Sequence, residues 1–385
     1  MVQTVLVLGG GTGGIVTANE LARMAGNDGD INPLRIILFE KEEKHVKGPL
    51  LLWLMSGKRA PDEISRSTIK LAGNGIEVVI GEIESIDPGN ITVKVNGQVY
   101  QGDHMVVSLG MVQKTNPVLQ ELGYNFHTVE GAEALHQHLQ TFKGGNVAVV
   151  VPSLPYKGPT SPYQAAMLIE GILQEQGLAK SSQVSLYSPE SEPLDLYSEP
   201  FSSSVYQLLA QRNIKYYPNY KLLSATADTL RFENGETASY DLLVHTPKFE
   251  CPDVILNSAL AGDSGWIEVD PHYMETDFKN VYAIGDIINI QLPVGEPLPK
   301  TGVVAARQGK VVAYNIVQKA FETGSKLHTY DGDGELFFET GDGKAEVVEG
   351  HFYAWPYPVL NIKKPDQISR FSKVLSEKYW WFRYF

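Results

Sequence analysis

Cysteine is almost absent from this sequence. Only Cys251 occurs among 385 residues, so no disulfide can form within one chain. This excludes a small secreted fold held by disulfides, and it excludes a redox centre built from two thiols of the same chain. We interpret Cys251 as a small core residue, with a nucleophilic thiol as the alternative.

The sequence also lacks long hydrophobic runs and an excess of positive charge. No apolar run reaches the roughly 18 residues that a transmembrane helix needs. The opening MVQTVLVLGGGTGG has no basic leader and no cleavage site of small residues, so we expect a mature strand and a cytoplasmic protein. The formal net charge of -13 would repel a phosphate backbone and disfavours nucleic acid as a partner.

The composition that remains is typical of a globular protein. Hydrophobic residues make up 43% and charged residues 20%, which allows a substantial core and argues against disorder. A chain of this length can form two or three domains.

A glycine motif follows the first apolar run. In TVLVLGGGTGGIVTANELARMA, the residues Gly9, Gly11 and Gly14 have the G-x-G-x-x-G spacing and precede a helical apolar pattern. Gly9 permits a tight turn, Gly11 lets the backbone approach a diphosphate, and Gly14 lets helix and strand pack closely. The next apolar run, LRIILFE, ends at Glu40, whose carboxylate can accept hydrogen bonds from a ribose and disfavours a 2′-phosphate. The motif predicts FAD or NAD rather than NADP, with a glycine-rich turn that binds nothing as the alternative.

A second motif lies far along the chain, in KNVYAIGDIINIQLPVGEPLPKTGVVAARQGKVVA at 279–313. A strand pattern ends at Gly285 and Asp286, and a loop then leads to a long helix. An aspartate at a strand end suits the ribityl hydroxyls of a flavin, and the helix N-terminus suits the electron-rich side of its ring. We therefore favour non-covalently bound FAD, although Asp286 could also be a simple turn residue.

The segment NVYAIGD resembles the second FAD motif of flavoproteins with two dinucleotide-binding domains. This superfamily includes pyridine nucleotide-disulphide reductases, type II NADH dehydrogenases and sulfide:quinone oxidoreductases. The resemblance implies that the glycine motif and Glu40 hold the ADP half of FAD, while Asp286 holds the ribityl chain. Gly110 preserves a turn that the related families also have. The residues expected to bind FAD are Gly9, Gly11, Thr12, Gly13, Gly14, Glu40, Lys41, Gly110, Gly285, Asp286 and Lys300.

The order of these motifs predicts an α/β fold with two Rossmann-like dinucleotide-binding domains. We expect a discontinuous FAD domain at 1–112 and 257–326, in which a β-meander with the turns DPGN and VNGQ leads to the buried strand HMVVSLG. The second Rossmann-like domain is expected at 113–256. Residues 327–385 then form a C-terminal region whose last part associates with a membrane.

The second domain has an unusual loop where a nucleotide would be expected. After NVAVVV the sequence reads PSLPYKGPTSPYQ, with four prolines and Gly158 as its single glycine. Proline has no N–H to offer a diphosphate, and its ring blocks the approach of one. NADH binding in the usual place is therefore disfavoured.

This loop resembles the PYKCPPAPYE segment of sulfide:quinone oxidoreductases and of the related flavocytochrome c sulfide dehydrogenases. The resemblance extends to KGPLLLWLMSGKR, PKTGVVAARQGKVVAYNI and GELFFETGDGKAEVVEGHF, and it covers nearly the whole chain. The matching loop residues are Pro155, Tyr156, Lys157, Pro159, Pro162 and Tyr163.

The resemblance also identifies what is missing. Enzymes of that family use cysteines beside the flavin, because a thiolate accepts sulfide and passes electrons to the ring. One cysteine belongs at Gly158, its partner at Leu336, and a third, when present, near Phe126 or His127. None of these residues is cysteine, and Cys251 matches none of the positions. The resemblance therefore implies a related enzyme without the sulfide-handling centre.

Lys300, in PKTG, marks the side of the site that would face a quinone. The resemblance places this residue at the start of the last FAD-domain helix, beside the pyrimidine edge of the flavin. A cation there would stabilise an anionic reduced ring. A solvated surface lysine is the alternative.

The end of the chain has the pattern of a helix on a membrane surface. Its apolar stripe consists of Ile368, Phe371, Val374, Leu375, Tyr379 and Phe382. Its cations are Lys364, Arg370, Lys373, Lys378 and Arg383, and its interfacial aromatics are Trp380, Trp381 and Tyr384. The resemblance implies the same role, so we expect a peripheral protein on the cytoplasmic face of a membrane. A helix packed on its own domain or on a partner subunit is the alternative, and a homo-oligomer stays open.

Three functions follow from these features, none of which needs a metal site. The first is an FAD-dependent oxidoreductase that delivers electrons to a quinone from a donor not handled by a cysteine pair. The second is an NADH:quinone reductase with atypical NADH binding. The third is a flavin-bearing subunit of a larger complex without substrate chemistry of its own.

Overall fold

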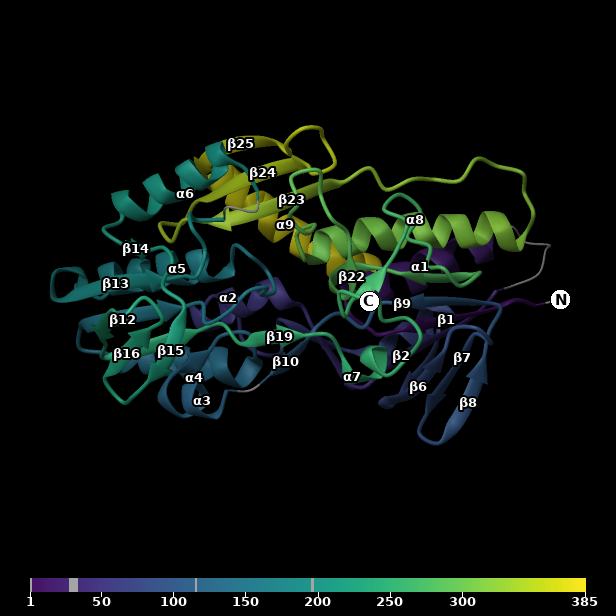
Figure 1. Cartoon of the computed structure of the whole chain (residues 1–385), viewed down its shortest axis with the longest axis horizontal. Helices are drawn as coiled ribbons and strands as arrows, with labels where there is room; N and C mark the ends of the chain where they lie inside the picture. The colour runs from purple at the N-terminus through teal and green to yellow at the C-terminus, as the bar shows by residue number, and fades with distance from the viewer. Residues whose placement is uncertain (1, 28–33, 115, 195–196) are drawn as a thin grey trace.

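The computed structural model describes residues 2–27, 34–114, 116–194 and 197–385 (Figure 1). Two five-stranded sheets dominate it, and every strand pair within each of them is parallel. Parallel sheets are buried on both faces, which explains why their strands read as continuous apolar runs rather than as alternating patterns. The α/β fold class expected from the sequence is confirmed.

The first sheet combines segments from distant parts of the chain. Its order is β21-β9-β1-β2-β5, and its strands are β1 (Thr4–Leu8), β2 (Arg35–Glu40), β5 (Glu77–Ile80), β9 (His104–Val107) and β21 (Val281–Ala283). Helices α1 (Thr12–Asn27) and α8 (Gly302–Ala320) lie side by side over this sheet (Figure 1). A small antiparallel sheet extends beyond it, made of β6 (Ile83–Asp87), β7 (Thr92–Val95) and β8 (Gln98–Gln101).

The second sheet is local in sequence. Its order is β11-β18-β12-β13-β14, with β11 (Tyr124–Asn125), β12 (Gly145–Val150), β13 (Ser182–Tyr187), β14 (Lys215–Tyr217) and β18 (Leu242–His245). The accompanying elements are α3 (Pro117–Leu122), α4 (Val129–Thr141), α5 (Ser161–Glu175), α6 (Glu199–Gln211) and an antiparallel sheet of β15 (Leu222–Ala225), β16 (Thr229–Phe232) and β17 (Thr237–Ser239).

Two short crossing segments connect the sheets. They are β10 (Val112–Lys114) and β19 (Lys248–Glu250), which pair antiparallel. The remaining short elements are β3 (Lys44–Val46), α2 (Leu51–Met55), β4 (Ser65–Ser67), α7 (Asp253–Leu256), β20 (Ile267–Glu268) and β22 (Ile288–Asn289). The domain boundaries proposed from the sequence stay predictions.

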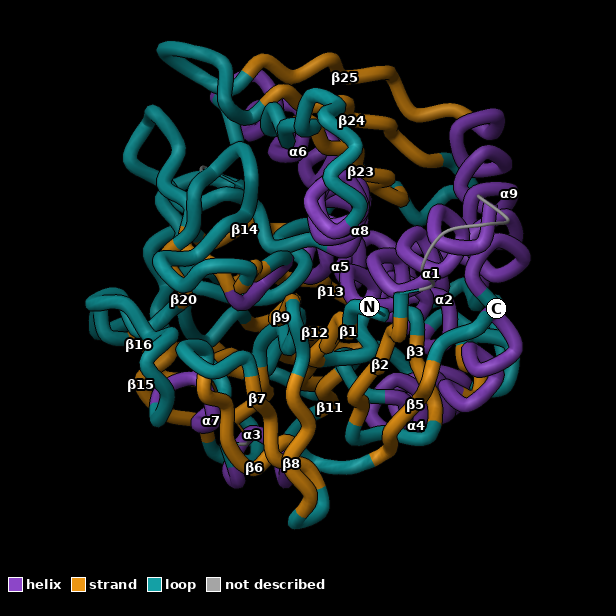
Figure 2. Tube along the Cα trace, turned by 90° about the vertical axis from the view of Figure 1, so that its right-hand side faces the viewer, coloured by secondary structure: helices purple, strands orange, loops and turns teal. Residues whose placement is uncertain are grey.

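The C-terminal region contains a three-stranded antiparallel sheet that the sequence did not predict. It consists of β23 (Asp333–Glu339), β24 (Ala345–His351) and β25 (Val359–Asp366), and it leads directly into α9 (Gln367–Tyr384). Asp366 caps this helix by accepting a hydrogen bond of 2.6 Å from the Ser369 N–H. Figure 2 shows α9 at the outer edge of the molecule.

The two faces of α9 differ in exposure. The outer face carries Ile368, Phe371, Leu375, Tyr379 and Phe382, whose exposed fractions range from 50% to 86%. The expectation that the terminal aromatics all face a bilayer is wrong, because Trp381 and Tyr384 are buried against the body of the protein. Two of the predicted surface cations also point inward, since Lys373 pairs with Glu339 and Arg383 with Glu20. Among the helices of the described residues, none combines the length and the apolarity needed to cross a bilayer.

Candidate functional site

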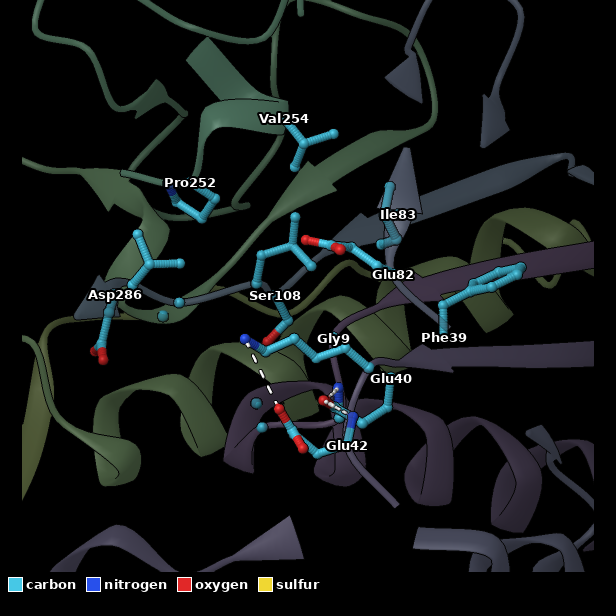
Figure 3. A pocket seen from close by; sticks show the side chains of 18 of the residues that line it. Gly9, Phe39, Glu40, Glu42, Glu82, Ile83, Ser108, Pro252, Val254 and Asp286 are labelled. Carbon is cyan, nitrogen blue, oxygen red and sulfur yellow. Dashed lines mark hydrogen bonds and ion pairs between the residues drawn. The ribbon is translucent and has the colours of Figure 1, made fainter. Parts of the chain in front are cut away.

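A cavity of about 990 Å³ opens at the carboxyl ends of the strands in the first sheet. This is the edge at which open parallel sheets bind their ligands. In Figure 3, Asp286 lies on one side of the cavity and Glu82 and Ile83 on the other, with Gly9 and Ser108 between them. The sequence-predicted residues that line it are Gly9, Gly11, Thr12, Gly13, Glu40, Lys41, Gly110, Gly285 and Asp286.

The glycines of the loop after β1 have different structural reasons. Gly9 has φ +102°, and a Cβ there would lie 2.5 Å from the Ser108 carbonyl oxygen, so only glycine fits. A Cβ on Gly14 would collide with the Gly9 carbonyl oxygen, and Gly14 does not line the cavity. A Cβ on Gly11 would meet only the Ser108 oxygen, at 4.0 Å. Gly11 therefore borders open space at the N-terminus of α1, which suits a diphosphate.

Glu40 closes this loop from the end of β2. Its Oε2 accepts a hydrogen bond of 2.6 Å from the Gly10 N–H, and its Oε1 accepts one of 3.0 Å from the Glu42 N–H. The carboxylate is thus fixed beside the glycine loop, where a ribose would follow the diphosphate. Lys41, the next residue, is exposed and lies 3.9 Å from the Glu42 carboxylate.

The other end of the cavity is built around Asp286. Its side chain is 7% exposed and lies 3.3 Å from the ammonium group of Lys157. The N–H of Gly285 donates to Oε1 of the buried Gln308 over 2.8 Å. Gln308 therefore fixes the strand-end turn that presents Asp286, which the sequence alone did not indicate.

Lys300 lies next to this end but is not part of the cavity wall. Its ammonium group donates to the carbonyl oxygens of Asp286 (2.7 Å) and Ile288 (3.0 Å) and lies 4.3 Å from the centre of the Trp266 ring. Burial lowers the pKa of Lys300 to about 8, against the opposing effect of Asp286. Lys300 is thus not a freely solvated lysine. Helix α8 begins two residues after it, at Gly302, with Thr301 as its N-cap.

The positions of the expected cysteines lie outside the cavity wall. Gly158 has φ +63°, and its N–H faces the Lys300 carbonyl oxygen at 3.4 Å. Leu336 is a half-buried residue of β23. His127 is half-buried and shares a hydrogen bond of 3.2 Å with the Ser161 hydroxyl, and desolvation of its ring lowers its pKa to about 3. Cys251 is buried, and this raises the pKa of its thiol to about 11, against the opposing effect of Lys300.

The proline-rich loop at 151–160, after β12, packs on the buried carboxylate of Glu190. Glu190 follows β13, where a dinucleotide-binding domain places the acid that holds a ribose. Here Glu190 is 2% exposed, and it accepts hydrogen bonds from the hydroxyls of Tyr156, Tyr163 and Ser188. The carboxylate therefore anchors the proline-rich loop from inside the protein.

Part of the cavity wall could not be found in the sequence. Glu82, Ile83 and Ser85 from the region of β6, and Pro252, Asp253, Val254 and Asn257 around α7, line its far side. These two segments are about 170 residues apart, and α7 packs directly on β6. Neither segment carries a spacing that signals a ligand. His45 and Lys157 line the cavity as well and were not assigned to it beforehand.

Comparison with known proteins supports one family. The sequence model described as pyridine nucleotide-disulphide oxidoreductase matches residues 3–309. A mitochondrial sulfide:quinone oxidoreductase of Mus musculus is 22% identical over 369 residues, which cover 91% of this chain and 79% of the relative. A type II NADH:quinone oxidoreductase of Staphylococcus aureus is 23% identical over 381 residues, covering 89% and 92%. The crystal structure of the sulfide:quinone oxidoreductase from Aquifex aeolicus superposes with a TM-score of 0.86 at 22% identity, over 99% of this chain and 91% of that one.

Proposed function

The chain belongs to the pyridine nucleotide-disulphide oxidoreductase family and is an FAD-dependent oxidoreductase; from this premise we propose that it passes electrons to a quinone from a donor other than sulfide held by a cysteine pair. The quinone is suggested by relatives named sulfide:quinone and NADH:quinone oxidoreductases. The observation that carries the restriction on the donor is that the chain has one cysteine, Cys251, and that Gly158 and Leu336 occupy the positions expected for a cysteine pair. Cys251 is also buried, which raises the pKa of its thiol to about 11 and favours the protonated form at neutral pH.

The residues of the cavity fit FAD. Its volume of about 990 Å³ is at the upper end of the range for small-molecule sites, as a large cofactor requires. In our proposal the Gly11 region receives the diphosphate, Glu40 the ribose and Asp286 the ribityl chain. When bound, FAD supplies a carrier that takes two electrons from one substrate and gives them to another.

The protein's own groups would set the charge at the flavin end. Lys157 balances the Asp286 carboxylate, and Lys300 is held on two carbonyl oxygens of the same turn. With a pKa of about 8, Lys300 is mostly protonated at pH 7. We assign to Lys300 the stabilisation of negative charge during reduction. At the positions of Gly158 and Leu336, a relative that uses thiols would have cysteine.

We further propose that the protein works on the cytoplasmic face of a membrane. The exposed apolar face of α9 supports contact with a membrane surface, because a face of this kind buries favourably at a bilayer surface. Trp355 and Tyr357, which are 80% and 70% exposed, lie in the connection between β24 and β25 and are candidates for the path of a quinone.

An anaerobic titration tests this function. Purified holoprotein is mixed with sulfide and with NADH, and holoprotein reduced by dithionite is mixed with an oxidised short-chain quinone, while flavin absorbance is recorded. We expect sulfide and NADH to leave the flavin oxidised over seconds, and we expect flavin reduced by dithionite to be reoxidised by an oxidised quinone. Rapid bleaching by sulfide would overturn the claim on the donor. Failure of quinone to reoxidise the flavin would remove the proposed acceptor and favour a flavin-bearing subunit.

An NADH:quinone reductase is the second candidate, because the chain and the Staphylococcus aureus relative cover one another almost completely. The closed loop around Glu190 weighs against it. Rapid bleaching by NADH in the same titration would establish it in place of our first proposal.

A further inference from the structure

The end of the chain encloses one side chain of the cavity wall. His45, on β3, is 7% exposed. The rings of Trp380 and Phe385 stack on its imidazole with centroid distances of 5.4 and 5.8 Å and interplanar angles of 29°. The Trp381 ring meets it edge-on at 6.0 Å. Three aromatic residues within 380–385 thus surround a histidine that lies more than 300 positions earlier.

The enclosed histidine makes one specific polar contact. Its Nδ1 lies 3.0 Å from the carbonyl oxygen of Gly10. Because a carbonyl oxygen only accepts, Nδ1 must carry the proton and donate it. Its Nε2 is buried without a hydrogen-bond partner among the described residues, and burial lowers the pKa of His45 to about 4. His45 is therefore neutral at physiological pH, with its proton on Nδ1.

This hydrogen bond acts on the glycine loop. The Gly10 N–H is held by Glu40 at 2.6 Å, and the Gly10 carbonyl is held by His45. The Gly10 carbonyl and the Gly11 N–H belong to one planar trans peptide, so they point in opposite directions and turn together. His45 thereby fixes the direction of the Gly11 N–H, which belongs to the cradle assigned to the diphosphate.

Further contacts attach the last turns of α9 to the same domain. The Lys47 ammonium group lies 4.6 Å from the centre of the Trp380 ring, and the Arg66 guanidinium lies 4.6 Å from that of Trp381. Arg383 pairs with Glu20 of α1 at 3.1 Å. None of the three enclosing aromatics lines the cavity, so their effect on a bound cofactor is indirect. Of the side chains that they touch, His45 is the one that lines the cavity and contacts the glycine loop.

We propose that His45 is a positioning residue for the diphosphate-binding loop and that Trp380, Trp381 and Phe385 hold it in place. Attachment of the end of α9 and binding of FAD are then coupled, and each strengthens the other. The inference rests on the assignment of FAD to this cavity. It makes residues 380–385, which do not line the cofactor cavity, a determinant of the affinity for FAD.

The test measures the dissociation constant of FAD for the apoprotein by quenching of flavin fluorescence. His45→Phe keeps an aromatic ring but removes the donor, and we expect about tenfold weaker binding. His45→Asn places an amide N–H near the position of Nδ1 and should recover most of the affinity. Trp380→Ala should weaken binding about fivefold. Phe382→Ala is the control, because this residue of the same helix is 86% exposed and should leave the affinity unchanged.

A double variant distinguishes coupling from a general loss of stability. If Trp380 acts through His45, Trp380→Ala will weaken binding much less in the His45→Phe background than in the wild type. Hydrogen exchange gives the reciprocal readout: FAD should protect the amides of 380–385 in the wild type and not in His45→Phe. Equal FAD affinity of wild type and His45→Phe, or additive effects in the double variant, would overturn the proposal. A wild-type protein that binds no flavin would instead refute the assignment of the cavity.

Discussion

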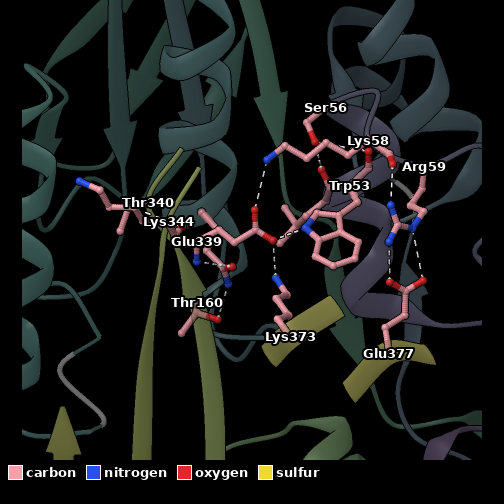
Figure 4. Close-up of polar contacts among 12 residues, drawn as sticks. Trp53, Ser56, Lys58, Arg59, Thr160, Glu339, Thr340, Lys344, Lys373 and Glu377 are labelled. Carbon is pink, nitrogen blue, oxygen red and sulfur yellow. Dashed lines mark hydrogen bonds and ion pairs between the residues drawn. The ribbon is translucent and has the colours of Figure 1, made fainter. Parts of the chain in front are cut away.

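A buried ion-pair cluster of Glu339, Lys373 and Lys58 joins α9 to the rest of the protein and allows a quantitative prediction (Figure 4). The carboxylate of Glu339, on β23, accepts hydrogen bonds from Lys373 of α9 at 2.7 Å, from Lys58 at 3.2 Å and from the indole N–H of Trp53. The side chains of Glu339 and Lys373 are 2% and 11% exposed. We predict that Glu339→Leu destabilises the protein far more than Glu339→Leu combined with Lys373→Met.

The magnitude follows from the burial of both charges. Burial raises the pKa of Glu339, but Lys373 and Lys58 outweigh this effect and lower the pKa to about 2 from 4.5. A difference of this size corresponds to roughly 3 kcal/mol, and breaking one side of a buried pair costs roughly 3–5 kcal/mol. Removing the charges of Glu339 and Lys373 together leaves neither of the two uncompensated, and Lys58, which loses the carboxylate, is 28% exposed and can be solvated. The double variant should therefore recover about 2 kcal/mol relative to Glu339→Leu alone.

Denaturation in urea, followed by tryptophan fluorescence, measures these differences. The control is Lys363→Met, because Lys363 and Glu349 also lie 2.7 Å apart, with side chains 51% and 49% exposed. It should cost below about 1 kcal/mol, since water screens an exposed pair. A double variant less stable than Glu339→Leu would refute the reasoning. So would a Lys363→Met control that loses as much unfolding free energy as Glu339→Leu. In the wild type, the contribution of Glu339 should be present above pH 4.5 and be lost as the pH falls toward 2.

Three further results are expected. Burial raises the pKa of Glu346 to about 7 from 4.5, so the folded protein loses stability as the pH rises from 4.5 through 7. In thermal melts, Glu346→Gln should add up to about 3 kcal/mol of stability at pH 8 and little at pH 4.5. The control Glu349→Gln, on the same strand but exposed, should add none at pH 8. Gly11→Ala should fold with an unchanged melting temperature but bind FAD at least tenfold more weakly in fluorescence titrations, because its Cβ meets only open cavity; unchanged affinity would contradict the assignment of the diphosphate. Phe371→Glu, on the exposed apolar face of α9, should reduce cosedimentation with liposomes severalfold, while Ser372→Glu, exposed on the same helix, should have a smaller effect. Equal binding by the wild type and both variants would contradict the membrane proposal.

The part of the fold that the sequence predicts is the part set by local constraints. The spacing of Gly9, Gly11 and Gly14 reflects contacts within one strand, turn and helix, and the acid at the end of β2 lies 26 residues after the last of them. The strand end at Gly285 and Asp286 is local in the same sense. These residues meet because parallel strands end at one edge of a sheet, which the fold class already implies.

The rest depends on contacts between distant segments. The apolar periodicity of α9 predicted a helix with one apolar face, but it could not reveal that Trp381 turns inward or that Lys373 finds a carboxylate on β23. Spacing describes one element at a time, and a partner more than 30 residues away leaves no mark in it. For the same reason, the sequence did not predict that residues around β6 and α7 line the cavity. The roles of Gly158, Leu336 and Lys300 stay predictions.

The order of strands in the first sheet has a consequence for biosynthesis. β9 is paired on one side by β1, but its other neighbour, β21, lies about 175 residues later in the chain. The second sheet draws all its strands from 124–245, so it can close while β9 is still an open edge in the nascent chain. An unpaired edge is prone to join a foreign strand. Stalled or truncated chains that stop before β21 should therefore aggregate through the first sheet and not the second, and a chaperone that shields β9 would prevent this.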